Sequence, residues 1–314
     1  MKKLIYYLST ITTIIYITYR IVFTIPKSNI ITIILAILVL IVEGIDALFY
    51  IIYTFNILIY KKDAPKILSI SKNKYPNIDI FIATINESKE LLKETINACK
   101  NMKYPHPEKI HIYICDDGNR EEIKKLTEEL NVHYITRNNN ENAKAGNYNH
   151  ALKKTKSPYI ITFDADMTPT NDFLLKALPF LIENNNIGFI QFPQSFKDLD
   201  IFQRKFKLSG KIPYEQDYFY HKIQMAKNNT NCVICCGTNT IYSRKALRDI
   251  GGFATKTITE DIATGMLIEE KGYQAIAIPD DEAFGIVISV KELSESKKET
   301  SKDLVDESYP YCQK

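Results

Sequence analysis

The chain opens with two long apolar stretches separated by a short polar turn. The first stretch runs from Leu4 to Ile25, the second runs from Ile30 to Ile52, and Pro-Lys-Ser-Asn lies between them. Each is long enough to cross a hydrocarbon core of about 30 Å as a helix. The first stretch is too long for a cleavable signal, and no small-residue cleavage site follows it. The pattern therefore predicts a transmembrane helix pair over residues 1–60, with its apolar character continuing to Tyr60.

Charged residues orient this helix pair. Lysines flank both of its ends: Lys2, Lys3, Lys61, Lys62 and Lys66. Positive residues favour the cytoplasmic side of a membrane, so we expect both ends in the cytoplasm and the turn outside. This arrangement predicts a multi-pass protein of the cell (inner or plasma) membrane with its remaining chain in the cytoplasm.

Three charged residues interrupt the apolar stretches. Arg20 lies near the outer end of the first, where a long side chain can reach the membrane interface. Glu43 and Asp46 are three residues apart, which places them on one face of a helix. They either make a polar contact within a larger membrane bundle or mark where the helix leaves the bilayer. Both interpretations stay open.

Beyond a polar linker over residues 61–76, short apolar runs alternate with amphipathic segments. Strands are predicted at 78–84, 110–115, 132–137, 159–163 and 187–192. Helices are predicted at 87–102, 120–130, 143–153 and 171–183. Such alternation is typical of a mostly parallel α/β sheet with helices on both faces. We expect this domain over 77–290 and a polar tail over 291–314.

Composition narrows the function classes. The net charge of +3 and the lack of a basic stripe argue against a nucleic-acid partner. The six cysteines form no regular framework and indicate reduced thiols in a cytosolic setting. Cys232, Cys235 and Cys236 lie together, but no second Cys/His pair is nearby, so a zinc site is not favoured.

Acidic residues follow the predicted strands, at the edge where α/β sheets bind ligands. They are Glu87, Asp116, Asp117, Asp164 and Asp166, and Glu260 and Asp261 precede a later helical stretch. Crowded carboxylates repel one another and are costly to desolvate unless a cation compensates them. A divalent metal is the simplest compensation, and oxygen ligands select Mg²⁺ or Mn²⁺.

Two common nucleotide-binding motifs are missing from the sequence. No G-x-G-x-x-G follows the first strand, and no G-x-x-x-x-G-K-[ST] occurs. Any phosphates must therefore be held by metal and side chains.

The order of TINE, DDG, KAGNYNHAL, FDAD, CCGTN, IGGF and TITED resembles the cellulose-synthase-like branch of glycosyltransferase family 2. The resemblance covers roughly residues 78–285. It implies a GT-A nucleotide-sugar fold beside transmembrane helices, and inverting synthesis of a β-linked polysaccharide. The implied partners are a UDP-sugar donor (glucose above all), a polysaccharide acceptor, membrane lipid and possibly another synthase subunit.

The resemblance also implies a donor site. It places around uridine the residues Thr84, Asn86, Glu87, Asp116 and Asp117, although Thr84 and Asn86 also suit ordinary turn and capping chemistry.

At the diphosphate the resemblance implies Lys144, with Gly146 allowing close backbone approach; a solvated lysine is the alternative. Asp166 would bind chiefly the metal, and Asp164 the ribose and the metal. The metal would neutralise the departing diphosphate.

At the acceptor end the resemblance implies Asp261 as the general base, with Glu260 as the second choice. Acids also suit helix N-termini, so a capping role is the alternative. The segment containing Gly237 and Thr238 would lie near the acceptor, as would Gln194 with its neighbours Gln191 and Pro193. The aromatic-rich stretch 196–221 would be either an interfacial helix or a core stripe.

The chain departs from the family pattern in two respects. The Q-x-x-R-W motif is missing because the chain contains no tryptophan, and no apolar span follows residue 285. We therefore expect a C-terminally truncated synthase. Three functions stay open: a UDP-sugar hexosyltransferase, a non-catalytic or split subunit that binds UDP-sugar, and a transferase that adds one sugar to a lipid carrier.

Overall fold

The computed structural model describes residues 2–27, 29–59, 70–196, 205, 207, 213–214 and 216–285. Three predictions lie wholly or mostly outside these residues: the basic part of the linker (Lys61, Lys62 and Lys66), the tail over 291–314, and much of the aromatic stretch. Tyr60, to which the apolar pattern is predicted to continue, lies outside them as well.

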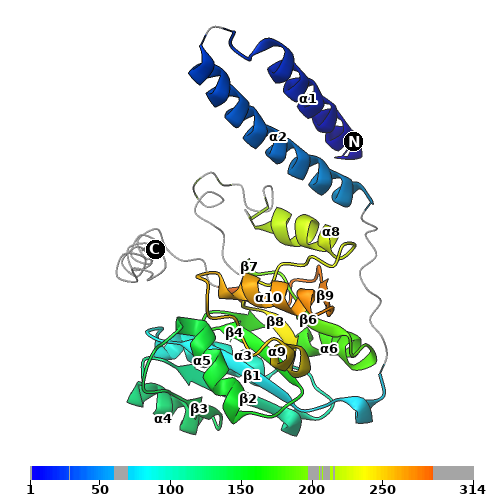
Figure 1. The fold of residues 1–314 in the computed structure, drawn as a ribbon. Helices are drawn as coiled ribbons and strands as arrows, with labels where there is room; N and C mark the ends of the chain where they lie inside the picture. Colours follow the sequence, from blue (N-terminus) through cyan, green and yellow to red (C-terminus); the bar gives the residue numbers. More distant parts are fainter. Residues whose placement is uncertain are drawn as a thin grey trace.

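Two long helices form an N-terminal hairpin that projects from the rest of the molecule (Figure 1). They are α1 (Lys2–Phe23) and α2 (Ile30–Ile59), and both are long and apolar enough to span a membrane. Arg20 of α1 donates to Glu43 of α2 over 2.8 Å, and Tyr16 adds a 3.2 Å hydrogen bond to the same carboxylate. Glu43 therefore makes a polar contact inside the hairpin. Asp46 has no such contact among the described residues.

A seven-stranded sheet forms the centre of the second part, in the order β3-β2-β1-β4-β8-β6-β9. Its strands are β1 (Ile78–Thr84), β2 (Ile110–Asp116), β3 (His133–Ile135), β4 (Tyr159–Asp164), β6 (Ile187–Gln191), β8 (Thr240–Ser243) and β9 (Gln274–Ala277). Only β8 runs antiparallel to its neighbours within this sheet. The predicted mostly parallel α/β sheet is confirmed, and the predicted strand positions agree with it to within about two residues.

Helices cover both faces of this sheet. On one face lie α3 (Lys89–Lys100), α4 (Glu121–Glu129) and α6 (Phe173–Glu183). On the other lie α5 (Ala143–Lys154), α8 (Met225–Lys227), α9 (Arg244–Asp249) and α10 (Glu260–Glu270). Strand β1 shows why: Ile78, Ile80 and Ile82 alternate into the first core, and Phe81 points into the second. Hydrophobic burial on both faces stabilises the three layers.

A small second sheet, β5-β10-β7, adjoins the first. Its strands are β5 (Thr168–Pro169), β7 (Ser195–Phe196) and β10 (Ala283–Gly285). Three short helical turns complete the described elements: η1 (Lys72–Lys74), η2 (Pro107–Lys109) and the π-helical η3 (Phe219–Gln224).

The aromatic stretch joins the two parts of the molecule. Both η3 and α8 contact α2, and α8 lies between the helix hairpin and the sheet (Figure 1). Tyr218 is 48% exposed and its hydroxyl lies 3.1 Å from that of Tyr6, whereas Tyr220 is buried in the domain. Lys227 lies 5.5 Å from the ring centroid of Tyr53. Tyr220 therefore fits the predicted core stripe, and the predicted interfacial helix stays a prediction.

Candidate functional site

Sheet register brings the strand-end acids to one edge. Thr84 pairs with Asp116 across β1 and β2, and Ala83 pairs with Asp164 across β1 and β4. Because these strands are parallel, their carboxyl ends, and the residues that follow them, lie side by side.

Arg120 organises the loops after β1 and β2. Its Nη2 donates to Thr84 Oγ1 (2.7 Å), its Nη1 to the Glu87 carbonyl (2.5 Å), and its Nε to Asp116 Oδ1 (3.2 Å). Asp116 is fully buried, and it also accepts the Gly118 and Arg120 amides and the Tyr134 hydroxyl. Charge-assisted bonds of this kind fix loop geometry.

The β1–α3 loop is fixed by a second carboxylate. Glu87 Oε2 accepts the Thr84 hydroxyl (2.7 Å) and the amides of Ile85 and Asn86 (2.8 and 3.2 Å). Thr84 is 4% exposed, so it and Asp116 present little surface to a ligand and act as supports of the loop. The predicted contact with uridine stays a prediction; Asn86 and Glu87 are the more exposed candidates.

Asp117 is paired with Arg137 by two parallel bonds. Arg137 Nε and Nη2 donate to its two oxygens over 2.7 and 2.6 Å, and both side chains are under 8% exposed. The same guanidinium donates to the carbonyls of Glu141 and Ala143 at the start of α5. A Cβ on Gly146 would collide with Arg137 and the Glu141 carbonyl, so this glycine permits close packing at the helix start.

Lys144 projects from α5 to the end of β4, where its ammonium pairs with Asp164. Burial lowers the pKa of Lys144, but Asp164 and Tyr148 raise it more, so the lysine stays charged. Its nitrogen also lies 5.8 Å from the Tyr148 ring centroid. A fixed cation thus stands beside the strand-end carboxylates, which is the chemistry a diphosphate needs.

Asp166 lies after β4 in a half-buried position. Burial, and then the negative charges of Asp164 and Glu87, raise its pKa. Within the described ranges no three Asp, Glu, His or Cys residues are grouped to hold a metal by themselves. Mg²⁺ and Mn²⁺ sites commonly use one or two carboxylates and complete their shell with substrate phosphates and water. Asp164 and Asp166 fit such a metal, since a cation would relieve the repulsion between them.

A buried glutamine builds the next wall of the site. Gln191 accepts the Cys236 amide and the Thr240 hydroxyl (2.8 Å each) and donates to the Thr238 carbonyl (2.9 Å). Thr238 Oγ1 in turn accepts the Asp164 amide over 3.0 Å. The Cys236–Thr240 segment is therefore fixed to the carboxyl end of β4.

Asp261 packs against this wall from the first turn of α10. Its Oδ1 accepts the Ile262 amide (2.8 Å), and its Oδ2 faces Gly237. Gly237 has φ +72°, and a Cβ there would lie 3.1 Å from both Cβ and Oδ2 of Asp261. The tight backbone turn thus leaves room for the carboxylate.

Several acids share the electrostatic field of this region. Burial raises the pKa of Glu260, Asp261 and Asp164 raise it further, and Lys144 opposes them. Burial raises the pKa of Cys236 to about 11, so its thiol stays protonated beside Asp261. The acids on α10 therefore face the same region as the strand-end pair.

Sequence reasoning found the acids but missed most of their partners. Arg120 and Arg137 were not singled out, nor were Tyr134, Tyr148 and Gln224. Arg120 follows Asp116 by four residues, and this spacing was the available signal. Gln224 exchanges two hydrogen bonds with the Ile234 backbone, which no local pattern indicates. Gln194 contacts Met167 Sδ at 3.9 Å, on the edge of the site.

Comparisons with known sequences agree with this geometry. A match to the family described as glycosyl transferase family 2 covers residues 79–251. The chain is 34% identical over 222 residues to a UDP-forming cellulose synthase catalytic subunit of Xanthomonas axonopodis pv. citri, covering 71% of this chain and 30% of that protein. It is 37% identical over 210 residues to the corresponding cellulose synthase 1 subunit of Komagataeibacter xylinus, covering 67% and 28%. The chain thus spans less than a third of the length of these relatives.

Solved structures share the fold. A mannosyltransferase of Pyrobaculum calidifontis, in complex with GDP-Man and Mn²⁺, aligns with a TM-score of 0.56 at 20% identity, covering 75% of this chain and 65% of that one. The TarS protein of S. aureus (residues 1–349), in complex with UDP-GlcNAc, aligns with a TM-score of 0.50 at 14% identity, covering 69% and 60%. Both likenesses concern the nucleotide-sugar-binding GT-A architecture of the sheet and its helices.

Proposed function

The chain belongs to glycosyl transferase family 2, and we propose that its strand-end site transfers a hexose from a UDP-sugar to a growing β-linked polysaccharide. Glucose is the sugar we expect first, given the likeness to UDP-forming cellulose synthase subunits. The observation that carries the proposal is the meeting, at one sheet edge, of a carboxylate pair, a fixed lysine and the acids of α10.

On the donor side, Asn86 and Glu87 would contact the uridine, in a loop that Arg120 holds in place. Asp117, paired with Arg137 and under 8% exposed, would support the neighbouring loop. Lys144 would exchange part of its pairing with Asp164 for the diphosphate oxygens. Asp164 and Asp166 would hold Mg²⁺ or Mn²⁺, which supplies charge neutralisation to the departing diphosphate. The raised pKa of Asp166 supports this assignment, because a cation would stabilise its charged form.

On the acceptor side, Asp261 Oδ2 would take the proton from the attacking hydroxyl. The hydroxyl oxygen bonds to the anomeric carbon as the bond from that carbon to the phosphate oxygen breaks. The configuration at the anomeric carbon is therefore inverted, and UDP leaves. One feature supports Asp261 over Glu260: its Oδ2 faces the turn at Gly237.

The helix hairpin would anchor this site to a membrane, with the sheet on the cytoplasmic side. Flanking lysines support that orientation. Tyr218 and the pairing of Lys227 with Tyr53 place η3 and α8 at the domain–hairpin junction, a position suited to lipid contact.

The non-catalytic and split-subunit functions are less favoured. A protein that only binds UDP-sugar needs no carboxylate such as that of Asp261 near the donor groups. The single-addition transferase differs in its product. It predicts one sugar per acceptor, whereas a polysaccharide synthase predicts a ladder of lengths.

The test is UDP release by the detergent-purified chain from UDP-glucose and UDP-N-acetylglucosamine, with Mg²⁺ or Mn²⁺. We expect metal-dependent release that is abolished in Asp166→Ala and Asp261→Ala. Asp172→Ala is the matched control, since Asp172 forms an exposed ion pair with Lys103; this variant should keep full activity. Binding of UDP without turnover of either UDP-sugar would refute the proposed transferase activity and favour the non-catalytic, UDP-sugar-binding subunit.

A further inference from the structure

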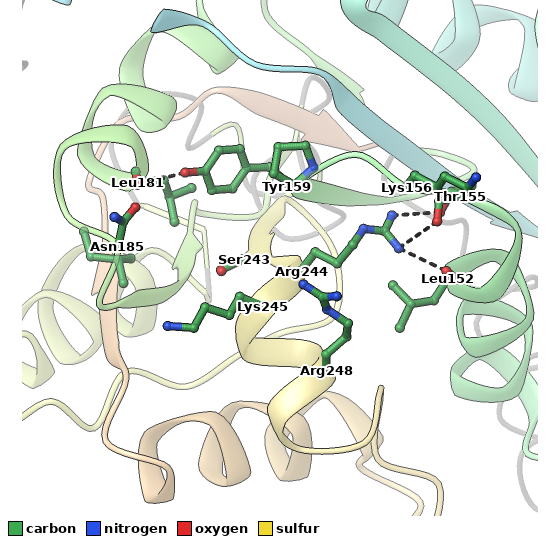
Figure 2. A pocket seen from close by; sticks show the side chains of 12 residues that line it. Leu152, Thr155, Lys156, Tyr159, Leu181, Asn185, Ser243, Arg244, Lys245 and Arg248 are labelled. Atoms are coloured by element: carbon green, nitrogen blue, oxygen red, sulfur yellow. Dashed lines mark hydrogen bonds between the residues drawn. The ribbon is translucent and has the colours of Figure 1, made fainter.

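A cavity lies at the opposite edge of the main sheet from the strand-end site. Its volume is about 680 Å³, and it is bordered by the start of β4 and the end of β8 (Figure 2). Tyr159 and Ser243 are register partners there, while Asp164 ends β4 at the other edge. At about 3.3 Å per residue, the cavity and Asp164 are separated by roughly 16 Å along the strand. A ligand in this cavity would therefore be separate from the donor.

The charged residues that line the cavity are all cations. They are Lys156, Arg244, Lys245 and Arg248, and none of the described lining residues is an aspartate or a glutamate. Arg244 is already neutralised: it is buried, donates to Asp79 over 2.7 Å, and also donates to the Leu152 and Thr155 carbonyls. Among the described residues, the other three have no ion pair within 4 Å. The rim thus carries three cations without an ion pair, one of which, Lys245, also lies 5.8 Å from the Tyr273 ring centroid.

The rest of the lining mixes apolar and uncharged polar side chains. Leu152, Pro158, Leu181 and Ile187 contribute to it with the ring of Tyr159, beside Thr155, Asn185 and Ser243. The Tyr159 hydroxyl donates to the Leu181 carbonyl over 2.9 Å, which holds the ring in place. Figure 2 shows Lys245 and Arg248 both projecting from α9 beside this lining. The volume lies within the usual range of about 300–1,000 Å³ for small-molecule sites, which combine apolar surface with a few convergent polar groups.

We propose that this cavity binds a phosphorylated small molecule that carries a ring, of about nucleotide size, as a second ligand site independent of the donor. The cations of the rim match phosphate oxygens, which lysine and arginine bind by charge-assisted hydrogen bonds. The apolar lining and Tyr159 receive the ring. The fixed Arg244–Asp79 pair contributes a rigid wall and leaves the charge at the rim for the ligand.

The test is calorimetric titration of the full chain with ATP, with saturating UDP and Mn²⁺ filling the donor site. We expect ATP to bind one further site. Lys245→Glu combined with Arg248→Glu should weaken this binding by at least about 30-fold, because each lost charge-assisted bond costs several-fold in affinity. UDP binding should be unchanged in this variant, which also shows that it is folded.

A matched control separates a site from general attraction. Lys124 and Lys125 are exposed on α4, on the other face of the sheet, and Lys124→Glu with Lys125→Glu makes the same change in net charge. ATP binding should stay within about twofold in this control. Adenosine, which has the ring without the phosphates, should not bind measurably. No ATP binding beside UDP, equal loss in both double variants, or adenosine binding as tight as that of ATP would each overturn the proposal.

Discussion

Replacing Gly237 by alanine tests whether the turn at Cys236–Thr238 positions the proposed base. Gly237 has φ +72°, which L-residues with a side chain adopt at a cost of about 1 kcal/mol. The new Cβ would also lie 3.1 Å from Cβ and Oδ2 of Asp261. Such a contact is a few tenths of an ångström too short, so the carboxylate must move by about that amount.

Gly237→Ala should have two separate effects, one on stability and one on the chemical step. Strain at Gly237 lowers the free energy of unfolding by about 1 kcal/mol. Displacement of Asp261 slows the chemical step by roughly three- to tenfold, because a 1 Å misplacement of a catalytic group can cost about 100-fold. The affinity for UDP should not change, since the donor groups lie in the loop after β1, at and after the end of β4, and on α5. Thermal unfolding and the kcat for UDP release measure the two effects separately.

Gly251→Ala is the matched control for this prediction. Gly251 also has positive φ, +89°, but no atom lies within 4 Å of a Cβ added there. This variant should lose similar stability and keep its kcat. Equal kcat in the two variants would refute the reasoning that Gly237 makes room for Asp261.

Three further variants probe the charges. Asp166→Asn should stabilise the metal-free protein at pH 7, because the folded state raises the pKa of Asp166 and so disfavours its charged form. A lower melting temperature of this variant than of the wild type in EDTA would contradict that expectation. The variant should also abolish the thermal shift that UDP with Mn²⁺ produces. Burial raises the pKa of Glu269 to about 7, so the wild type loses stability as pH rises from about 4.5 through 7. Glu269→Gln should therefore raise the melting temperature at pH 8 and raise it much less at pH 5; an equal effect at both would count against the burial of its charge. Arg137→Met leaves Asp117 unpaired and should lower the free energy of unfolding, measured with denaturant, by about 3 kcal/mol. Adding Asp117→Asn should restore part of this loss. A loss below about 0.5 kcal/mol would show that the pair is solvated.

The sequence predicted the α/β order well because each strand and helix has its own hydrophobic period. Ile78, Ile80 and Ile82 alternate as a two-sided buried strand requires, and α3 to α6 show helical spacing. The strands of the small sheet have only two or three residues, too few for a period to be visible. They form because the chain after β4, β6 and β9 is brought together by the larger sheet.

The sequence predicted which acidic residues lie at the site, but not which side chains pair with them. Glu87, Asp116 and Asp164 follow strands, so their common edge follows from parallel topology alone. Whether a carboxylate faces a ligand or a guanidinium depends on side-chain direction, which a residue pattern does not contain. Asp116 and Arg120 illustrate this, and so do Arg20 and Glu43, whose 2.8 Å pairing depends on how the two N-terminal helices pack.

Binding of UDP with and without Mn²⁺, measured by calorimetry on the wild type and on Asp164→Asn with Asp166→Asn, tests the central claim most directly. The claim is that the acids after β4 hold the metal that binds a nucleoside diphosphate at the strand-end edge. It predicts that UDP binds the wild type tightly only with Mn²⁺, and that the double variant binds UDP equally weakly with and without the metal. Metal-independent binding by the wild type, or undiminished metal-dependent binding by the double variant, would contradict it.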